Sequence, residues 1–197
     1  MKIGIDIDDT ISDTYNILFP YAQKYTIETL GRSGRLDTKQ AVNHMYIRTM
    51  HNWTDTEDQE FWNMYYDKCV KDVKIKPLAK EYLDKLAKDN EIYLITARFP
   101  GRSANIKELT IDWLKENEVP YDKLIFDAQD KVSIAKDLGL DLFIDDSYSN
   151  CKALSENGVK TLIMDSVVNS KFDIDNVTRV FSWPHIYQEY EKILKGE

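Results

Sequence analysis

Short apolar runs recur along the second half of the chain, separated by segments in which apolar residues return every three or four positions. The runs lie at residues 92–95, 124–126, 142–144, 161–164 and, more briefly, 180–181. The helical spacing predicts helices from Pro77 onward and at residues 103–116, 131–138, 150–156 and 184–195. Strands that alternate with helices predict βαβ units, a parallel sheet and right-handed crossovers. This half of the chain therefore indicates an α/β fold.

One more strand begins the chain, and a different pattern follows it. Ile3, Ile5 and Ile7 are β-branched residues among small or polar ones, which is typical of a short strand in the same sheet. Residues 14–73 then show helical spacing, many aromatic residues and no strand-like run, with helices expected at residues 12–30, 38–50 and 56–73. We therefore expect a core made of residues 1–13 and 74–197, with residues 14–73 inserted as a helical unit.

The first strand runs directly into a cluster of acidic residues. Asp6, Asp8 and Asp9 lie within four positions, and Asp6 and Asp8 point to one side if the backbone is extended. Like charges this close are tolerated when a cation neutralises them or when one carries a proton. Both conditions suit phosphoryl transfer, with an Asp nucleophile and Mg²⁺. An acidic helix start capped by Thr10 explains the motif equally well, so the motif alone leaves both interpretations open.

Polar residues follow apolar strands at three further places, namely Thr96, the loop before Lys131, and the pair Asp145 and Asp146. Each has an ordinary explanation, such as a helix cap or a solvated lysine. The carboxyl ends of parallel strands, however, lie along one edge of a sheet, where ligands bind. We therefore expect these residues to converge with the first acidic cluster on one site.

Composition narrows the range of partners. The chain has 197 residues, a net charge of −8 and a pI of about 5.0, which argue against a nucleic-acid polymer or an anionic membrane as the main partner. No apolar run approaches membrane-spanning length, and the first strand does not have the pattern of a signal peptide. Cys69 and Cys151 have no Cys or His at metal-ligand spacing. We expect a cytoplasmic protein with a small anionic ligand, and the sequence leaves its oligomeric state open, with a homodimer as one alternative.

These motifs resemble those of the haloacid-dehalogenase-like (HAD) phosphohydrolase superfamily. Residues 6–10 read D-I-D-D-T and match its first motif, D-x-D-x-T, while Thr96, Lys131 and the pair Asp145–Asp146 fit the second, third and fourth. The sequences around these motifs are similar to the 5′(3′)-deoxyribonucleotidase group and its bacterial nucleotidase relatives. The resemblance implies a three-layer, Rossmann-like parallel sheet with a small helical cap inserted after the first strand.

The resemblance also implies a role for each motif residue. Asp6 would attack phosphorus and form an aspartyl-phosphate, and Asp8 would serve as general acid and base. The metal ligands for Mg²⁺ would be Asp6, Asp8 through its backbone carbonyl, and Asp145 or Asp146. The remaining implied contacts are with the phosphate, from the Thr96 hydroxyl, the N–H groups near Ala97, and Lys131.

A cap of this kind closes over the site, excludes water and reads the leaving group. Trp53 and Trp62 are the aromatic residues that we expect to stack on a nucleobase, whereas Phe61 and Tyr65 are expected in the cap's own core. Arg98 follows the second motif and is a further candidate for substrate binding.

The leading hypothesis is therefore a Mg²⁺-dependent phosphomonoesterase acting on a small phosphate monoester, with a (deoxy)nucleoside monophosphate as the favoured substrate. A phosphatase for sugar or other small phosphates uses the same motifs, so only the cap separates the two. A phospho-acceptor signalling receiver also uses acidic residues, Thr, Lys and Mg²⁺, but the order of its motifs differs and it lacks the 60-residue insertion. A non-catalytic metal- or phosphate-binding protein is the remaining alternative.

Overall fold

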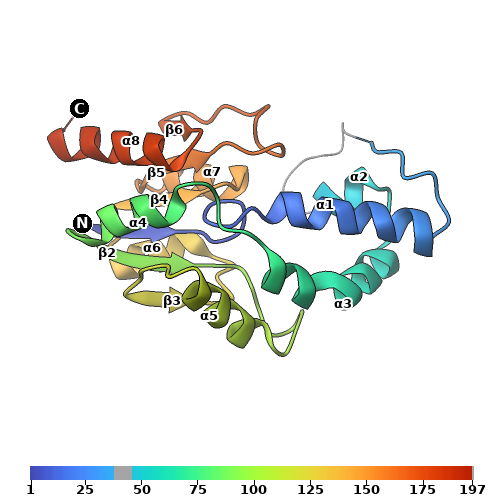
Figure 1. Ribbon diagram of the computed structural model, residues 1–197. Coiled ribbons are helices and arrows are strands. Elements are labelled where there is room, and N and C mark those ends of the chain that lie inside the picture. The colour runs from blue at the N-terminus through green and yellow to red at the C-terminus, as the bar shows by residue number, and fades with distance from the viewer. Residues whose placement is uncertain (38–45, 197) are drawn as a thin grey trace.

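Within the residues that the structure describes, six parallel strands form one sheet, which lies in the left-hand part of the molecule in Figure 1. In this computed structural model, residues 1–37 and 46–196 are described. The strand order is β3-β2-β1-β4-β5-β6, so the first strand lies inside the sheet. The strands are β1 (Lys2–Ile5), β2 (Glu91–Ile95), β3 (Lys123–Ile125), β4 (Leu142–Asp145), β5 (Lys160–Met164) and β6 (Val177–Val180). The predicted α/β class and parallel sheet are confirmed.

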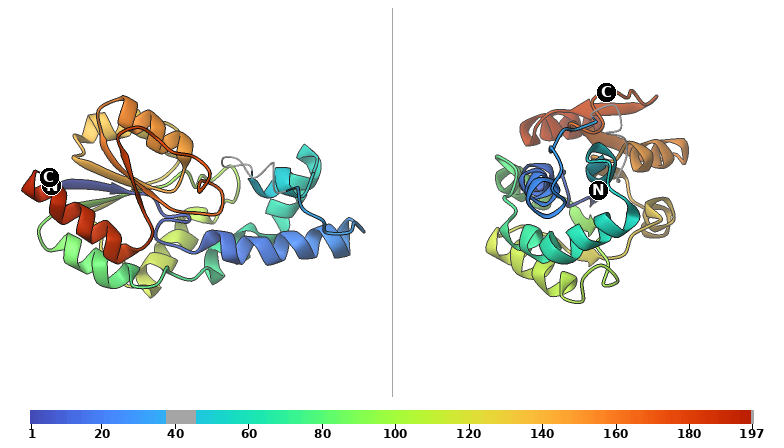
Figure 2. Two further views of the ribbon diagram at one scale, coloured as in Figure 1. Left: turned by 90° about the horizontal axis from the view of Figure 1, so that it is seen from above. Right: turned by 90° about the vertical axis from the view of Figure 1, so that its right-hand side faces the viewer.

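Helices cover both faces of this sheet and make three layers (Figure 2). One face packs on α4 (Ala79–Ala87), α5 (Ile106–Glu116) and α8 (Trp183–Lys195), and the other on α6 (Lys131–Leu138) and α7 (Tyr148–Glu156). Strand residues alternate between the two cores, as Ile92 and Leu94 do against Tyr93 and Ile95. Position 4 in β1 requires glycine, because a Cβ there would lie 2.8 Å from the ring of Phe143.

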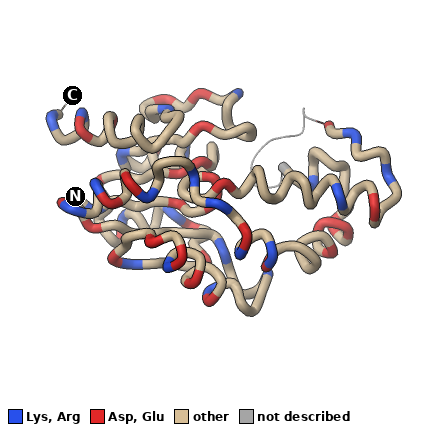
Figure 3. The backbone as a smooth tube through the Cα atoms, in the orientation of Figure 1, with Lys and Arg blue, Asp and Glu red and all other residues tan. Residues whose placement is uncertain are grey.

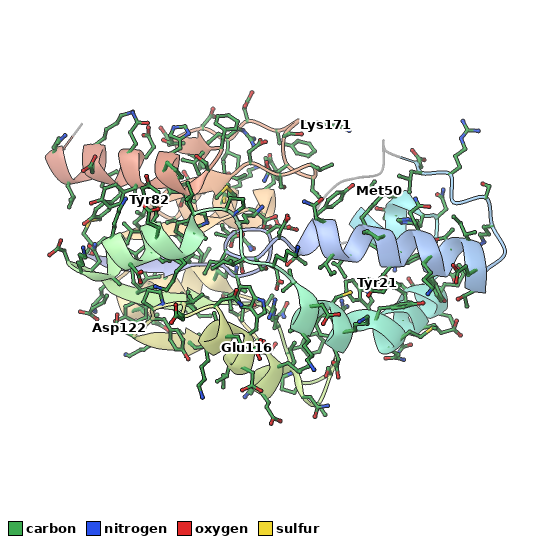
Figure 4. All side chains as sticks on the ribbon, in the orientation of Figure 1. Tyr21, Met50, Tyr82, Glu116, Asp122 and Lys171 are labelled. Carbon is green, nitrogen blue, oxygen red and sulfur yellow. The ribbon has the colours of Figure 1, made fainter. Side chains whose placement is uncertain are left out.

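A helical unit lies between β1 and α4 in the sequence and beyond the carboxyl ends of the strands in space (Figures 1 and 2). We call residues 14–73 the cap. Its helices are α1 (Thr14–Lys24), which continues into the π-helix η1 (Tyr25–Thr29), α2 (Tyr46–Met50) and α3 (Asp55–Asp72). Figure 4 shows Tyr21 between α1 and α3, where its ring lies 5.1 Å from that of Tyr65. The cap thus has an aromatic core of its own, separate from the two cores of the sheet.

The two chain crossings between the cap and the sheet lie side by side. The backbone N–H of Asp13 donates to the carbonyl of Lys74 at 2.8 Å, and that of Lys76 donates to Ile11 at 2.7 Å. Buried indole groups hold each crossing to the sheet helices, since Trp183 donates to the carbonyl of Thr10 and Trp113 to that of Val73. Both ends of the cap are therefore fixed to each other and to the core.

Local chemistry accounts for the differences from the predicted helix boundaries. The third helix begins at Asp55 because Thr54 and Glu57 form a reciprocal capping box. Leu78 has a left-handed backbone with φ of 65°, which delays the helix expected from Pro77 until Ala79. The predicted second cap helix begins at Thr38, but residues 38–45 lie outside the described residues.

Among the helices described, none is long and apolar enough to cross a membrane.

Candidate active site

A pocket of about 620 Å³ lies between the carboxyl ends of the strands and the cap. Its strand side includes Asp6, Asp8, Lys131, Asp145 and Asp146, so the acidic motifs far apart in the sequence converge as predicted. The pocket is also lined by cap residues from α1, α2 and α3. Figure 3 shows charged residues of both signs interspersed over the sheet domain and the cap, so the negative net charge is not confined to one element.

A tight turn after β1 presents the first acidic motif to the pocket. The backbone N–H of Asp6 donates to Ile144 at 2.9 Å, which continues the pairing with β4 and brings Asp6 beside the fourth motif. Ser12 donates both its backbone N–H and its hydroxyl to the carbonyl of Ile7. Asp9 takes a positive φ of 57° in this turn and accepts the backbone N–H of Tyr15, so its carboxylate caps the start of α1.

Lys131 joins the first and fourth motifs. Its Nζ lies 2.6 Å from Oδ1 of Asp6 and 2.8 Å from Oδ2 of Asp145, and the residue is only 4% exposed. Burial disfavours the ammonium ion, but the two carboxylates outweigh it and raise the pKa of Lys131. Helix α6 begins at Lys131, with Asp130 as its cap, and this places the ammonium group at the bottom of the pocket.

A third carboxylate, Asp146, lies beside the two that are bonded to Lys131. Oxygens of Asp6, Asp145 and Asp146 lie within 4.8 Å of one another. Burial, with the charges of Asp145 and Asp8, raises the pKa of Asp6 to about 7 in spite of Lys131. Burial also raises the pKa of Asp146, and the charges of Asp9, Asp145 and Asp6 add to this effect. A set of hard oxygen donors with this excess of negative charge fits a divalent cation such as Mg²⁺.

Asp145 and Asp146 differ in how fully their carboxylates are engaged. Asp145 accepts hydrogen bonds from Lys131, from the backbone N–H of Ser147 at 2.8 Å and from the amide of Asn150 at 3.0 Å. Within the described part of the chain, the Asp146 carboxylate accepts no hydrogen bond from another side chain. Asp146 therefore has the freer oxygens for a ligand in the pocket.

Asp8 has a different partner from Asp6. Arg98 donates Nε to Oδ2 of Asp8 at 2.9 Å and Nη2 to Oδ1 at 2.7 Å, and the Thr14 hydroxyl donates to Oδ1 at 2.8 Å. Burial alone would raise the pKa of Asp8, but the charge and hydrogen bonds of Arg98, with the Thr14 bond, bring it below its ordinary value. Arg98 also donates Nη1 to Thr110, and its side chain is 2% exposed. Arg98 lines the pocket as predicted, but its guanidinium is already engaged with Asp8 and Thr110.

The second motif reaches the pocket through Ala97 rather than through the Thr96 hydroxyl. Thr96 is 1% exposed, its backbone N–H extends the pairing with β3, and its hydroxyl accepts the N–H of Arg98 at 3.2 Å. Ala97 lines the pocket, whereas Thr96 does not. The prediction that the Thr96 hydroxyl faces a phosphate is therefore corrected, because this hydroxyl is turned into its own loop.

The two tryptophans of the cap occupy different environments. Trp53 is 6% exposed, and its indole N–H donates to the hydroxyl of Thr26. The centre of its ring lies 4.8 Å from that of Phe61 and 5.1 Å from that of Tyr25. The prediction that Trp53 stacks on a substrate is wrong, because its ring belongs to the cap core. Trp62 is half-buried and lines the pocket, and its contact with a substrate stays a prediction.

Three residues beside Trp62 were not among the predicted site residues. The Trp62 indole donates to Asp58 at 3.0 Å, and the Arg102 guanidinium lies 4.6 Å from the Trp62 ring centre. Tyr66 completes this side of the pocket. Residues 58, 62 and 66 are four positions apart and lie on one face of α3, so their spacing could have predicted that Asp58 and Tyr66 lie beside Trp62. Arg102 lies in the loop before α5, where no periodicity indicates a side-chain direction.

Comparison with known proteins agrees with this geometry. Residues 1–194 match the family described as 5′ nucleotidase, deoxy (pyrimidine), cytosolic type C. A nucleotidase of Clostridium acetobutylicum is 31% identical over 197 residues, covering 99% of this chain and 96% of that protein.

Solved structures show the same fold. A haloacid dehalogenase-like hydrolase from Streptococcus pneumoniae superposes with a TM-score of 0.67 at 14% identity, over 96% of this chain and 97% of that one. A HAD-superfamily hydrolase from Geobacter sulfurreducens gives a TM-score of 0.60 at 16% identity, over 96% and 99%. The resemblance read from the motifs is confirmed. The chain belongs to the deoxy-5′-nucleotidase family of HAD-like proteins, and it is a hydrolase of phosphoric monoesters.

Proposed function

We propose that this chain is a Mg²⁺-dependent nucleotidase that hydrolyses (deoxy)nucleoside monophosphates through an aspartyl-phosphate on Asp6. The observation that carries the proposal is the position of Asp6. Its carboxylate faces the pocket from the end of a central strand, bonded to Lys131 and within 4.8 Å of the oxygens of Asp145 and Asp146. The family's description as cytosolic supports a cytoplasmic location.

The donor set supports Mg²⁺ as the metal. Asp6, Asp146 and Asp145 offer carboxylate oxygens, and the backbone carbonyl of Asp8 is a fourth oxygen at the same turn. When bound there, Mg²⁺ supplies positive charge that offsets the carboxylates and the substrate phosphate. Lys131 alone cannot balance three carboxylates and a phosphate dianion.

The reaction divides between Asp6 and Asp8. A carboxylate oxygen of Asp6 forms a bond to phosphorus while the bond from phosphorus to the ester oxygen breaks, and Asp8 gives its proton to that oxygen. Water then attacks the phosphorus of the aspartyl-phosphate, Asp8 takes a proton from the water, and Asp6 is released with inorganic phosphate. Lys131 and the N–H groups around Ala97 stabilise the negative charge on the transferring group.

Arg98 is the positioning residue for Asp8. Its two parallel hydrogen bonds fix both carboxylate oxygens, and its charge favours the ionised form that accepts a proton from water. A bound phosphate ester brings further negative charge beside Asp8, which favours the protonated form needed for the first step. Substrate charge and Arg98 therefore act on Asp8 in opposite directions, as the two half-reactions require.

The cap side supports a nucleotide as the substrate. A pocket of about 620 Å³ is in the range that holds a nucleotide-sized ligand, and Trp62 and Tyr66 line it with aromatic rings from the cap. The family match and the nucleotidase relative point to the same substrate class.

Phosphate release from a panel of deoxy- and ribonucleoside monophosphates and sugar phosphates, with Mg²⁺ and with excess EDTA, tests the proposal. We expect the highest kcat/KM for a nucleoside monophosphate and no turnover in EDTA. A preference for sugar phosphates would replace the substrate assignment, and undiminished activity in EDTA would refute the metal requirement.

A further inference from the structure

A buried asparagine on the loop after β5 is hydrogen bonded to the backbone of Asp146. Asn169 is 1% exposed, and its Nδ2 donates to the carbonyl of Asp146 at 2.7 Å and to the carbonyl of Met164 at 2.7 Å. Met164 ends β5, and Asp146 follows the last residue of β4. The final paired residues of these strands are Asp145 and Ile163, so the Asn169 amide bridges the two chains just beyond the end of the ladder.

The hydrogen-bonding capacity of this amide is fully used. Its Oδ1 accepts the backbone N–H of Ser166 at 3.2 Å and an N–H from Nη1 of Arg179. With its two donated bonds, Asn169 thus makes the four hydrogen bonds that a side-chain amide can make. Asn169 lines the pocket, but it has no donor or lone pair left for a substrate or a metal. Its contribution to the site must therefore act through the residues that it holds.

Arg179 fixes Asn169 from the neighbouring strand. This arginine lies in β6, donates Nη1 to Asp165 at 2.7 Å and Nη2 to the carbonyl of Asn169 at 3.2 Å, and also donates to the carbonyl of Phe172. A single guanidinium thus ties the start, middle and end of the 165–172 loop. Arg179 does not line the pocket.

We propose that Asn169, held by Arg179, is a positioning residue that fixes the Asp146 peptide and so directs the Asp146 carboxylate toward Mg²⁺. The inference rests on the proposed function, because it assumes that Asp146 is a metal ligand. The Asp146 side chain is the least hydrogen bonded of the acidic group, so its direction depends on its backbone. Groups that orient metal ligands in this way typically change metal affinity by about 10- to 100-fold when they are removed.

The test is calorimetric titration of Mg²⁺ into the substrate-free protein, with thermal melting and steady-state kinetics beside it. We expect Asn169→Ala to weaken Mg²⁺ binding by about tenfold or more. At saturating Mg²⁺ its KM for substrate should stay near the wild-type value, because Asn169 has no free group for the substrate. Unchanged Mg²⁺ affinity in this variant would overturn the inference.

Asn90→Ala is the matched control. Asn90 also donates its amide to two partners, the carbonyl of Leu86 at 2.7 Å and the hydroxyl of Tyr190 at 2.8 Å, but it lies just before β2, at the opposite edge of the sheet. We expect a comparable decrease in melting temperature with unchanged Mg²⁺ affinity. If Asn90→Ala weakens Mg²⁺ binding as much as Asn169→Ala does, the effect is general destabilisation and the inference falls.

Arg179→Ala gives a second, independent variant if Asn169→Ala does not fold. Removing a positive charge near an acidic site favours cation binding by direct electrostatics. The proposal predicts the opposite sign, a loss of Mg²⁺ affinity of about threefold, because Asn169 loses its support. An unchanged or higher affinity would contradict it. A wild-type protein that binds no Mg²⁺ would instead refute the metal in the proposed function, and this inference with it.

Discussion

The strand side of the pocket and its cap side are built from different kinds of interaction. On the strand side, charged groups are bonded in fixed pairs. Lys131 is buried with Asp6 and Asp145, and the buried Arg98 pairs with Asp8, whose side chain is 38% exposed. On the cap side, Trp62 and Tyr66 are half-buried rings, and the charged groups beside Trp62 are the Asp58 carboxylate at its indole N–H and the Arg102 guanidinium over its ring. Buried ion pairs hold a single geometry, whereas a ring face accepts many partners. We therefore propose that the strand side carries the reaction common to all substrates and that the cap side carries the choice among them.

The largest expected effect is on the strand side, from Asp6→Asn. The amide keeps the shape of the side chain but removes the nucleophile, so we expect kcat to fall by about 10⁴-fold or more for every substrate. The fold should survive because Lys131 retains Asp145 as a partner. Assays of phosphate release and thermal melting check this expectation. Substantial turnover by the folded variant would show that Asp6 is not the nucleophile.

The next effect should separate the two residues of the fourth motif. Asp146→Asn is expected to weaken Mg²⁺ binding by about 10- to 100-fold with a small change in melting temperature. Asp145→Asn is expected to lower the melting temperature more, because Lys131 and Asn150 lose a charged partner. Calorimetry with Mg²⁺ and thermal melting on both variants measure the split, and the reverse ranking would make Asp145 the more direct ligand.

A smaller loss is expected from Arg98→Lys, which keeps the positive charge but loses the two parallel bonds to Asp8. General acid–base catalysis contributes about 10²–10⁴-fold, so a misdirected Asp8 should lower kcat by about 10-fold or more. KM should change little, because the Arg98 guanidinium is engaged with Asp8 and Thr110 rather than with substrate. An increase in KM with unchanged kcat would instead show that Arg98 binds the substrate directly.

The smallest expected effect, and the most selective, is on the cap side. Stacking contributes about 1–3 kcal/mol per base, so Trp62→Ala should lower kcat/KM for nucleoside monophosphates by about tenfold while affecting a small aryl phosphate much less. Trp53→Ala is the matched control, since it should destabilise the protein by about 3–5 kcal/mol without changing the ratio of the two activities. Equal losses on both substrates for Trp62→Ala would contradict the assignment of substrate choice to the cap side.

How much the sequence predicts differs between the same two sides. Helix α6 begins and ends where its spacing predicts, and Asp6, Lys131 and Asp145 meet because the ends of parallel strands must share an edge. Those are rules of local pattern and topology. The pairing of Arg98 with Asp8, 90 residues away, and the bond from Asn169 to Asp146 depend on side-chain directions that spacing does not encode.

The structure of the cap follows local sequence pattern less closely, for a related reason. Trp53 and Trp62 are equally aromatic and both lie near helical segments, and only the packing of η1 against α3 makes Trp53 a core residue. The π-helix at Tyr25–Thr29 has no signal in the spacing that predicted a continuous helix. Contacts between elements decided both cases.

The paired crossings at the base of the cap make it exchangeable. Because the chain leaves the sheet at Asp13 and returns at Lys74 within one hydrogen bond, the inserted segment can grow, shrink or be replaced without moving any strand. Asp6, Lys131 and Asp145 are bonded to one another within the sheet domain, whereas Asp8 also accepts a hydrogen bond from Thr14 at the first turn of the cap. One uninterrupted stretch of gene can therefore carry a change of substrate range, so an enzyme of this plan can gain a new substrate by recombination as well as by point mutation.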